Sequence, residues 1–258
     1  MSKMFAKERR NLILDLLQQK KRITVKDLSK SLQVSEATLR TDLNVMEDEG
    51  LLTRTHGGAV LNETENLSAE SSFSERAKKN KEQKVAITNK AFELIREKDC
   101  VLLDASTTAL ELARILKQKP MRLTVVTNGI SAAVELKENP SLNVILLGGM
   151  ARLGSMALEG LLGTQILDKI NVDLVFTSAS GFTMEDGLTD FSMYEVELKK
   201  VMVEKANKVV ALIDHTKIGT SSIASFATAE QIDTFITDKN APQDVLQALI
   251  NSGIEVIS

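Results

Sequence analysis

Along the first sixty residues, apolar positions recur with the spacing of three short amphipathic helices. The first helix is predicted over 6–19, the second begins after the capping residue Thr24, and the third begins after the capping residue Ser35. The predicted buried positions are Leu12, Ile13, Leu16, Leu17, Val25, Leu28, Leu32, Leu39, Leu43 and Met46. Two strand-like runs then flank the pair Gly57-Gly58, which is typical of a wing. Residues 1–61 therefore predict a winged helix-turn-helix, although a small structural subdomain would show a similar helical pattern.

The polar face of the third predicted helix carries side chains suited to the major groove of DNA. Small residues let a helix approach base edges, Arg40 can bind guanine or a phosphate, and Asn44 can pair with adenine. Near the tip of the predicted wing, Arg54 and His56 are placed to reach the backbone or a minor groove. The candidate DNA-binding residues are Lys26, Ser35, Ala37, Thr38, Arg40, Thr41, Asn44, Arg54 and His56. Because phosphates would repel Asp42, we expect it to have a partner within the helix-turn-helix.

Residues 62–80 are polar and are interpreted as a linker to a second, larger domain over 81–258. In that domain, buried-strand runs alternate with helical patterns such as 109–116 and 191–205. The strand runs are 101–103, 123–126, 144–147, 174–176, 209–213 and 232–236. This alternation predicts an α/β fold with a largely parallel sheet that helices cover on both faces.

Small and polar residues follow most of the predicted strands. In parallel sheets, ligands collect at the carboxyl ends of the strands, and hydroxyls beside a helix N-terminus suit a phosphate. The candidate effector-binding residues are Asp104, Ser106, Thr107, Thr108, Thr127, Asn128, Gly148, Gly149, Gly181, Glu195 and Lys217, of which Lys217 supplies the cation. Plainer interpretations remain open, because a hydroxyl run also caps helices, glycine pairs form turns, and Glu195 has the i, i+4 spacing of an ion pair with Lys199.

Composition narrows the class of protein. The 258 residues are 43% hydrophobic and only 3% aromatic, as in an aliphatic-rich globular protein with room for two domains. No segment resembles a signal peptide or a membrane span, so a cytoplasmic location is expected. The net charge is -3, yet residues 1–60 carry eleven Lys and Arg against eight Asp and Glu, which is compatible with a basic face there. Cys100 is expected to be a buried small hydrophobe, and no metal or catalytic role is assigned to His56 or His215.

Taken together, these motifs resemble the DeoR family of bacterial sugar-operon repressors. In the first domain the resemblance rests on Arg9, Ile13, Leu17, Ser35, Thr38, Leu39, Arg40, Asp42, Leu43 and the run Arg54-x-His56-Gly57-Gly58-Ala59. In the second it rests on Asp104 with 106–108, Thr127-Asn128, Gly148-Gly149 and Asp214-x-x-Lys217. The family usually has a second basic residue at Thr41 and a glycine at Ser106. The first departure removes one possible phosphate contact, and the second restricts positive φ angles in the loop.

The resemblance implies a second domain related in fold to ribose-5-phosphate isomerase and the coenzyme A transferases. It also implies a homodimeric or homotetrameric repressor of a sugar or polyol operon. Such a repressor binds double-stranded operator DNA without a cofactor, and a phosphorylated sugar or polyol releases it. Two alternatives stay open: an enzyme in which Asp104 or Glu195 acts as a base on a sugar phosphate, or a second domain that only oligomerises.

Overall fold

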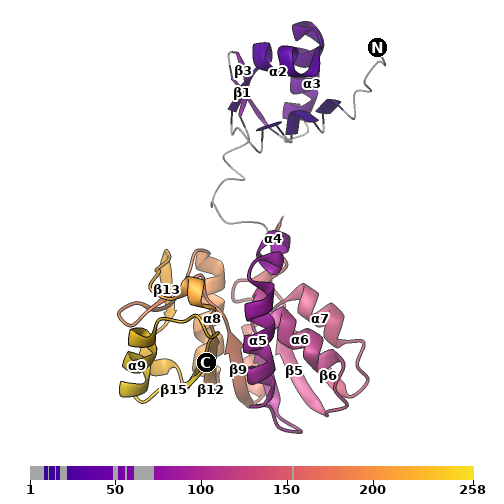
Figure 1. The fold of residues 1–258 in the computed structure, drawn as a ribbon. Helices are drawn as coiled ribbons and strands as arrows, with labels where there is room; N and C mark the ends of the chain where they lie inside the picture. The colour runs from indigo at the N-terminus through magenta and orange to yellow at the C-terminus, as the bar shows by residue number, and fades with distance from the viewer. Residues whose placement is uncertain are drawn as a thin grey trace. The chain divides into compact units, whose positions relative to one another are not determined.

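The computed structural model describes residues 9–10, 12–14, 16–17, 22–48, 52–55, 57–60, 73–152 and 154–258 (Figure 1). The chain divides into two compact units, residues 1–70 and 71–258. The division falls within the segment expected as a linker, and the last part of that segment, including helix α4 (Phe73–Lys78), belongs to the second unit. No helix in the described ranges has the length and apolar character needed to cross a membrane.

The first unit is a winged helix-turn-helix, as predicted. The described residues among 9–17 are helical, and they are followed by β1 (Arg22–Thr24), α2 (Val25–Leu32), α3 (Glu36–Asp48), β2 (Thr53–Thr55) and β3 (Gly58–Val60). The strands form an antiparallel sheet in the order β1-β3-β2. Most of the predicted apolar positions lie in one buried cluster, with Leu16 and Leu32 at its edge, whereas Leu12 is exposed.

Local hydrogen bonds explain where the helices begin and end. The Thr24 hydroxyl accepts a bond from the Asp27 amide at 3.1 Å, and the Ser35 hydroxyl accepts one from the Thr38 amide at 3.3 Å. Both bonds satisfy amides that have no acceptor within their own helix. Gln33 ends α2 in the left-handed conformation, with φ of 53°, so the predicted turn at residues 33 and 34 is confirmed.

The turn of the wing lies one residue earlier than the sequence suggested. Gly58 is the first residue of β3, where it pairs with Thr24 on one side and Thr55 on the other. A Cβ at Gly58 would lie 2.0 Å from the Ile23 carbonyl oxygen. The glycine is therefore required by close strand packing rather than by the turn. His56 lies outside the described residues.

The second unit is built on a seven-stranded parallel sheet, which confirms the predicted fold class. Its order is β15-β14-β12-β9-β4-β5-β6, and all neighbouring strands are parallel. The strands are β4 (Cys100–Leu103), β5 (Leu123–Thr127), β6 (Leu142–Leu146), β9 (Val172–Thr177), β12 (Ala206–Leu212), β14 (Thr234–Ile236) and β15 (Glu255–Ile257). Strand β15 was not predicted. Cys100, expected to be buried, is half-buried at the start of β4.

Helices cover both faces of the parallel sheet. On one face lie α5 (Lys81–Phe92), α6 (Thr107–Lys117) and α7 (Ile130–Leu136), and on the other lie α8 (Met193–Lys205) and α9 (Gln243–Asn251). Within β4, Val101 and Leu103 pack in the apolar cluster under α5, α6 and α7, and Leu102 packs in the cluster under α8 and α9. Successive residues of a strand point to opposite faces, so both faces of this strand are buried.

Smaller elements are added at the carboxyl end of the sheet and were not predicted. Strands β7 (Met150–Ala151) and β8 (Leu158–Glu159) form a hairpin, and β10 (Gly181–Thr183), β11 (Gly187–Asp190) and β13 (Ala224–Ala227) form a separate antiparallel sheet. Three short 3-10 turns complete the unit: η1 (Thr164–Lys169), η2 (His215–Lys217) and η3 (Ala229–Gln231).

The two glycines of the wing should tolerate substitution differently. Gly58→Ala forces a methyl group against the Ile23 carbonyl, so we expect the first unit to lose about 1–3 kcal/mol of stability. Gly57→Ala is the matched control, because a Cβ at Gly57 would have no atom within 4 Å. Hydrogen exchange of the β1 and β3 amides in the full chain measures both effects. Equal protection in the two variants would contradict the packing argument.

Candidate nucleic-acid interface and anion site

Helix α3 exposes to solvent the polar face that was predicted from the sequence. Leu39, Leu43 and Met46 are fully buried. The exposed side chains of its other face are Ala37, Thr38, Arg40, Thr41 and Asn44, with Glu36 in the first turn. The predicted orientation of the helix is therefore confirmed, and a small, hydroxylated and cationic surface is available to a large partner.

The cation on this face already has a weak partner. Arg40 Nη2 donates to Glu36 Oε2 at 3.0 Å, one turn away along the helix, and both side chains are exposed. Ion pairs of this kind contribute only about 0.3–0.5 kcal/mol. Arg40 can therefore exchange Glu36 for a phosphate or a guanine at little cost.

Arg54 connects the wing to α3 instead of standing free at the wing tip. Its Nη1 donates to Asn44 Oδ1 at 2.5 Å, and its backbone amide donates to Glu47 Oε1 at 2.8 Å. An asparagine that pairs with adenine uses both its amide oxygen and its amide nitrogen. Arg54 therefore occupies one of the two acceptor positions of the Asn44 amide oxygen.

Asp42 has the internal partners that we expected. Its carboxylate is buried and accepts bonds from Arg9 Nε at 2.5 Å and from Arg10 Nε at 3.2 Å. These contacts attach the first helix to α3. Of the remaining candidates in the first unit, Lys26 is exposed on α2, and Ser35 is exposed and caps α3.

In the second unit, the candidate site lies at the point where the strand order reverses. From β4 the chain proceeds through β5 and β6 toward one edge of the sheet, and through β9, β12, β14 and β15 toward the other. The loops after β4 and β9 therefore leave the sheet in opposite directions, and in folds of this kind a ligand binds in the crevice between two such loops. Asp104 follows β4, and Ser178 follows β9.

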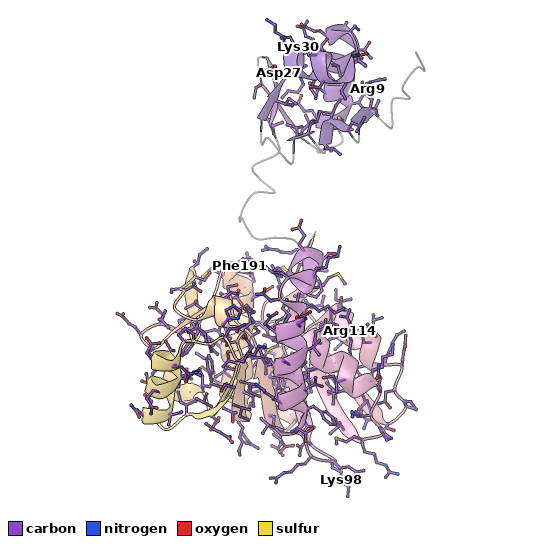
Figure 2. All side chains as sticks on the ribbon, viewed as in Figure 1. Arg9, Asp27, Lys30, Lys98, Arg114 and Phe191 are labelled. Atoms are coloured by element: carbon purple, nitrogen blue, oxygen red, sulfur yellow. The ribbon has the colours of Figure 1, made fainter. Side chains whose placement is uncertain are left out.

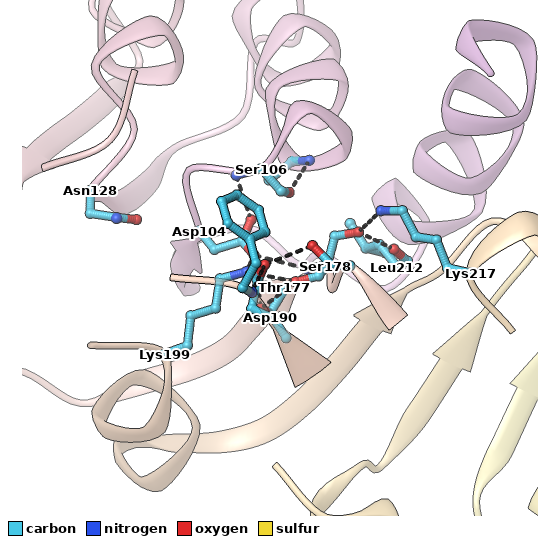
Figure 3. A network of polar contacts seen from close by, with 12 residues as sticks. Asp104, Ser106, Asn128, Thr177, Ser178, Asp190, Lys199, Leu212 and Lys217 are labelled. Atoms are coloured by element: carbon cyan, nitrogen blue, oxygen red, sulfur yellow. Dashed lines mark hydrogen bonds and ion pairs between the residues drawn. The ribbon is translucent and has the colours of Figure 1, made fainter. Parts of the chain in front are cut away.

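Asp104 is fully buried and joins these two loops (Figure 3). Its Oδ2 accepts bonds from the Thr177 hydroxyl and the Ser178 amide, both at 2.8 Å. Its Oδ1 accepts a bond from the Ser106 amide at 2.9 Å. Because the carboxylate oxygens have these protein donors, Asp104 shapes the loops of the site rather than offering a free acceptor.

Lys199 supplies the positive charge that compensates this buried carboxylate. Its Nζ lies 3.3 Å from Asp104 Oδ2, and it donates to Asp190 Oδ2 at 2.7 Å and to the Ser178 carbonyl at 2.8 Å. Burial disfavours the ammonium, but the two carboxylates outweigh burial and raise the pKa of Lys199. The alternative that Glu195 pairs with Lys199 is not met within the described ranges, where the ion pairs of Lys199 are with Asp190 and Asp104.

A second group of cations lies beside Ser178. Lys217 Nζ donates to the Ser178 hydroxyl at 2.9 Å, and burial lowers the pKa of Lys217. Burial and the charge of Lys217 together lower the pKa of the buried Lys84 to about 8. The carboxylate of Asp214 acts in the opposite direction on both lysines, and a bound anion would likewise favour their charged forms.

The start of α6 contributes hydrogen-bond donors to the same region. The Ser106 hydroxyl accepts a bond from the Ala109 amide at 3.0 Å, which leaves the first-turn amides of Thr107 and Thr108 without an acceptor inside the helix. Ser106 has φ of -70°, so serine in place of the family's glycine causes no backbone strain here. An anion at this helix N-terminus would meet amides, a hydroxyl and the helix dipole.

Asn128 stands at the end of the neighbouring strand β5 and has an unused acceptor. Its Nδ2 donates to the Leu158 carbonyl at 3.1 Å, while its buried Oδ1 has no hydrogen-bond partner in the described part of the chain. Figure 3 shows Asn128 on the opposite side of Asp104 from Lys217. This oxygen can accept a bond from a ligand hydroxyl. Thr127 is used internally, since its hydroxyl accepts a bond from the Gly129 amide at 3.0 Å.

The remaining candidates are three glycines and Glu195. Gly148 and Gly149 follow β6, and a Cβ at Gly149 would lie 2.6 Å from the Glu159 carbonyl oxygen. Gly181 begins β10, where it packs against the backbone of Thr220. Both Gly149 and Gly181 therefore have a packing reason to be glycine. Glu195 is half-buried on α8, and burial raises its pKa to about 7.

Sequence reasoning missed several residues that shape the site. Thr177, Ser178, Asp190 and Lys199 come from β9, the loop after it, β11 and α8. The position of Ser178 directly after a buried strand was a usable signal. No local sequence pattern indicates that Asp190 and Lys199 contact Asp104, because these contacts depend on which strands are neighbours in the sheet.

Comparisons with known proteins agree with this arrangement. Two family models match: the DeoR-like helix-turn-helix domain over residues 9–65 and the DeoR C terminal sensor domain over residues 79–239. The HTH-type transcriptional regulator GolR of Listeria innocua is 46% identical over 253 residues, 98% of each chain. The glycerol-3-phosphate regulon repressor of Escherichia coli is 27% identical over 249 residues, 96% of this chain and 97% of that one. Among solved structures, ribose 5-phosphate isomerase A of Methanocaldococcus jannaschii covers 54% of this chain and 55% of its own, with 17% identity and a TM-score of 0.41.

Removing the buried cation should destabilise the second unit. Lys199→Met leaves the carboxylates of Asp190 and Asp104 buried without their ammonium partner, so the free energy of unfolding should fall by about 3–5 kcal/mol. Lys200→Met is the matched control on the exposed side of α8 and should change it by less than about 0.5 kcal/mol. Denaturant unfolding followed by circular dichroism compares them. A common midpoint for both variants would rule out the compensating role of Lys199.

Proposed function

The chain belongs to the DeoR family of transcriptional regulators, and from that premise we propose that it represses a sugar or polyol uptake or catabolism operon and leaves its operator when a phosphorylated sugar or polyol binds. The observation that carries the proposal is the pairing of an outward-facing α3 with a group of hydroxyl and lysine side chains at the strand ends. The name of the Escherichia coli relative refers to a phosphorylated polyol, which supports the class of effector.

On the DNA side, α3 enters the major groove and the wing follows the backbone. Ala37, Thr38, Arg40 and Thr41 approach base edges or phosphates, and Asn44, which also bonds to Arg54, reads a base. Lys26 and Ser35 contact phosphates beside the groove, and Arg54 with His56 completes the contact from the wing. One winged helix touches few base pairs, so a homodimer or homotetramer in the cytoplasm binds the operator through paired half-sites.

On the effector side, the phosphate binds between the N-terminus of α6 and Lys217. The amides of Thr107 and Thr108, the Ser106 hydroxyl and the Lys217 ammonium are its donors. Asn128 Oδ1 and Glu195 accept bonds from the hydroxyls of the sugar or polyol. Asp104 and Thr127 hold the loops in place, and Gly148, Gly149 and Gly181 let neighbouring backbone pack around them.

For release, the effector must bind the arrangement that does not fit the operator more tightly than the one that does. A ligand of equal affinity for both arrangements would shift neither, however tightly it bound. Occupation of the crevice therefore has to change the position of an element that leads toward the first unit.

We propose that this unit is not an enzyme. Asp104, one of the two carboxylates considered as a base, accepts bonds from the Ser106 amide, the Thr177 hydroxyl and the Ser178 amide. Glu195, with a pKa of about 7, is the group best suited to proton transfer. Turnover of ribose 5-phosphate by the purified chain, lost in Glu195→Gln, would favour the enzyme alternative.

Arg40→Ala should weaken operator binding. Loss of a base or phosphate contact at the helix corresponds to about 1–3 kcal/mol, which is roughly 5- to 150-fold in affinity. Mobility-shift titrations with the chain's own promoter DNA measure this change. Arg122→Ala, an exposed arginine of the second unit, removes the same charge and should leave affinity within about twofold. Equal weakening by both variants would show that general charge, and not the face of α3, accounts for binding.

Lys217→Ala should abolish or strongly weaken effector binding and leave operator binding intact. A charge-assisted bond to a phosphate contributes about 1.5–3 kcal/mol, so the affinity for the effector should fall roughly 10- to 150-fold. Calorimetry with glycerol 3-phosphate, ribose 5-phosphate and inorganic phosphate measures it, with the exposed Lys208→Ala as the control. The proposal fails if the parent binds none of a wider panel of phosphorylated sugars and polyols, or if none of them changes its operator affinity.

A further inference from the structure

The junction between α4 and α5 makes an unusual contact with the loop that carries Lys217. Asn80 occupies this junction in the left-handed conformation, with φ of 52° and ψ of 38°. Its side chain does not cap α5. Instead, Asn80 Nδ2 donates to Asp214 Oδ1 and to Thr216 Oγ1, both at 3.1 Å.

Asp214 organises the turn that aims Lys217. It is buried, its Oδ1 accepts a bond from the Thr216 amide at 3.1 Å, and its carbonyl accepts one from the Lys217 amide at 3.0 Å. The turn η2 is a single 3-10 turn of three residues, and the Asp214 side chain caps its start. Asn80 therefore holds the short element from which the Lys217 ammonium reaches Ser178.

Helix α4 is attached to the same neighbourhood by two further contacts. The Lys84 ammonium donates to the carbonyls of Arg76 and Lys79, which closes the end of α4 against α5. The Arg76 guanidinium lies 5.5 Å from the centre of the Phe191 ring. Phe191, labelled in Figure 2, is next in sequence to Asp190. In sequence, the residues before α4 lead to the first unit. The bonds of Asn80 therefore connect η2 to the end of α4, and the contacts of Lys84 and Arg76 hold α4 in the same region.

We propose that Asn80 is the positioning residue that couples occupation of the anion site to α4, and thereby to operator binding; this rests on the proposed function. In this proposal a phosphate draws the Lys217 ammonium, which also donates to the Ser178 hydroxyl, toward itself and thereby shifts η2. Displacement of η2 changes the bonds of Asp214 and Thr216 to Asn80. Coupling requires such contacts to differ between the two states, and the amide of Asn80 provides them.

The test is Asn80→Gly in the full chain. Glycine adopts the left-handed conformation without strain, so this variant removes the amide and keeps the backbone. Asn251→Gly, at the exposed end of α9, is the matched control. Calorimetry gives the affinity for glycerol 3-phosphate or ribose 5-phosphate, and mobility shifts give the operator affinity with and without saturating ligand.

We expect Asn80→Gly to bind the ligand and the free operator within about threefold of the parent, while the ligand-induced change in operator affinity disappears. In the parent and in Asn251→Gly, that change should be on the order of tenfold or more. Thr216→Val removes one of the two acceptors of the amide and keeps Asp214, so it should lose part of the coupling. Combined with Asn80→Gly it should add nothing further, because Asn80→Gly already removes both bonds.

The outcomes separate the two proposals. If neither glycerol 3-phosphate nor ribose 5-phosphate alters the operator affinity of the parent, the proposed function is contradicted, and so is the coupling role of Asn80 that rests on it. If the parent responds and Asn80→Gly responds equally, only the coupling role of Asn80 is overturned. Should Asn80→Gly not fold, the response of Thr216→Val decides, and a full response in that variant overturns the proposal.

Discussion

The second unit depends on the buried contact between Asp104 and Lys199. Strands β4 and β9 diverge at the centre of the sheet, and the loops that follow them would otherwise have no common anchor. Asp104 bonds to both loops, and Lys199 compensates its charge while it also binds Asp190. Burying ions costs several kcal/mol each, and this cost is offset only where their bonding capacity is filled. The network therefore holds the walls of the crevice in one arrangement.

The groups left to meet a ligand follow from that arrangement. Since Asp104 is engaged internally, the site offers donors at the start of α6, the ammonium of Lys217 and the unused oxygen of Asn128. Burial, with repulsion between lysines as a smaller cause, lowers the pKa values of Lys84 and Lys217, which a bound anion would counteract. The first unit follows a similar rule, because Arg40 and Asn44 already have protein partners.

The periodicity of apolar residues was sufficient to predict the elements of the first unit and most of the parallel sheet. Buried faces of helices and strands repeat at 3.6 and 2 residues whatever their neighbours are, so such patterns can be read locally. The caps at Thr24 and Ser35, the inward position of Asp42 and the outward face of α3 were predicted on the same local grounds. Short elements such as β15 and the β7–β8 hairpin contain too few residues to show a period.

Contacts between distant segments could not be predicted in this way. Lys199 has the spacing of an ion pair with Glu195, yet it turns to Asp190 and Asp104 because burial favours the stronger compensation. Gly58 owes its identity to a strand more than thirty residues away, and Asn80 bonds to a turn more than a hundred residues away. The sequence by itself determined the elements, the fold class and the family, since these depend on local spacing and motifs. The tertiary structure alone decided which polar groups are used up inside the protein, because that depends on the order of strands in the sheet.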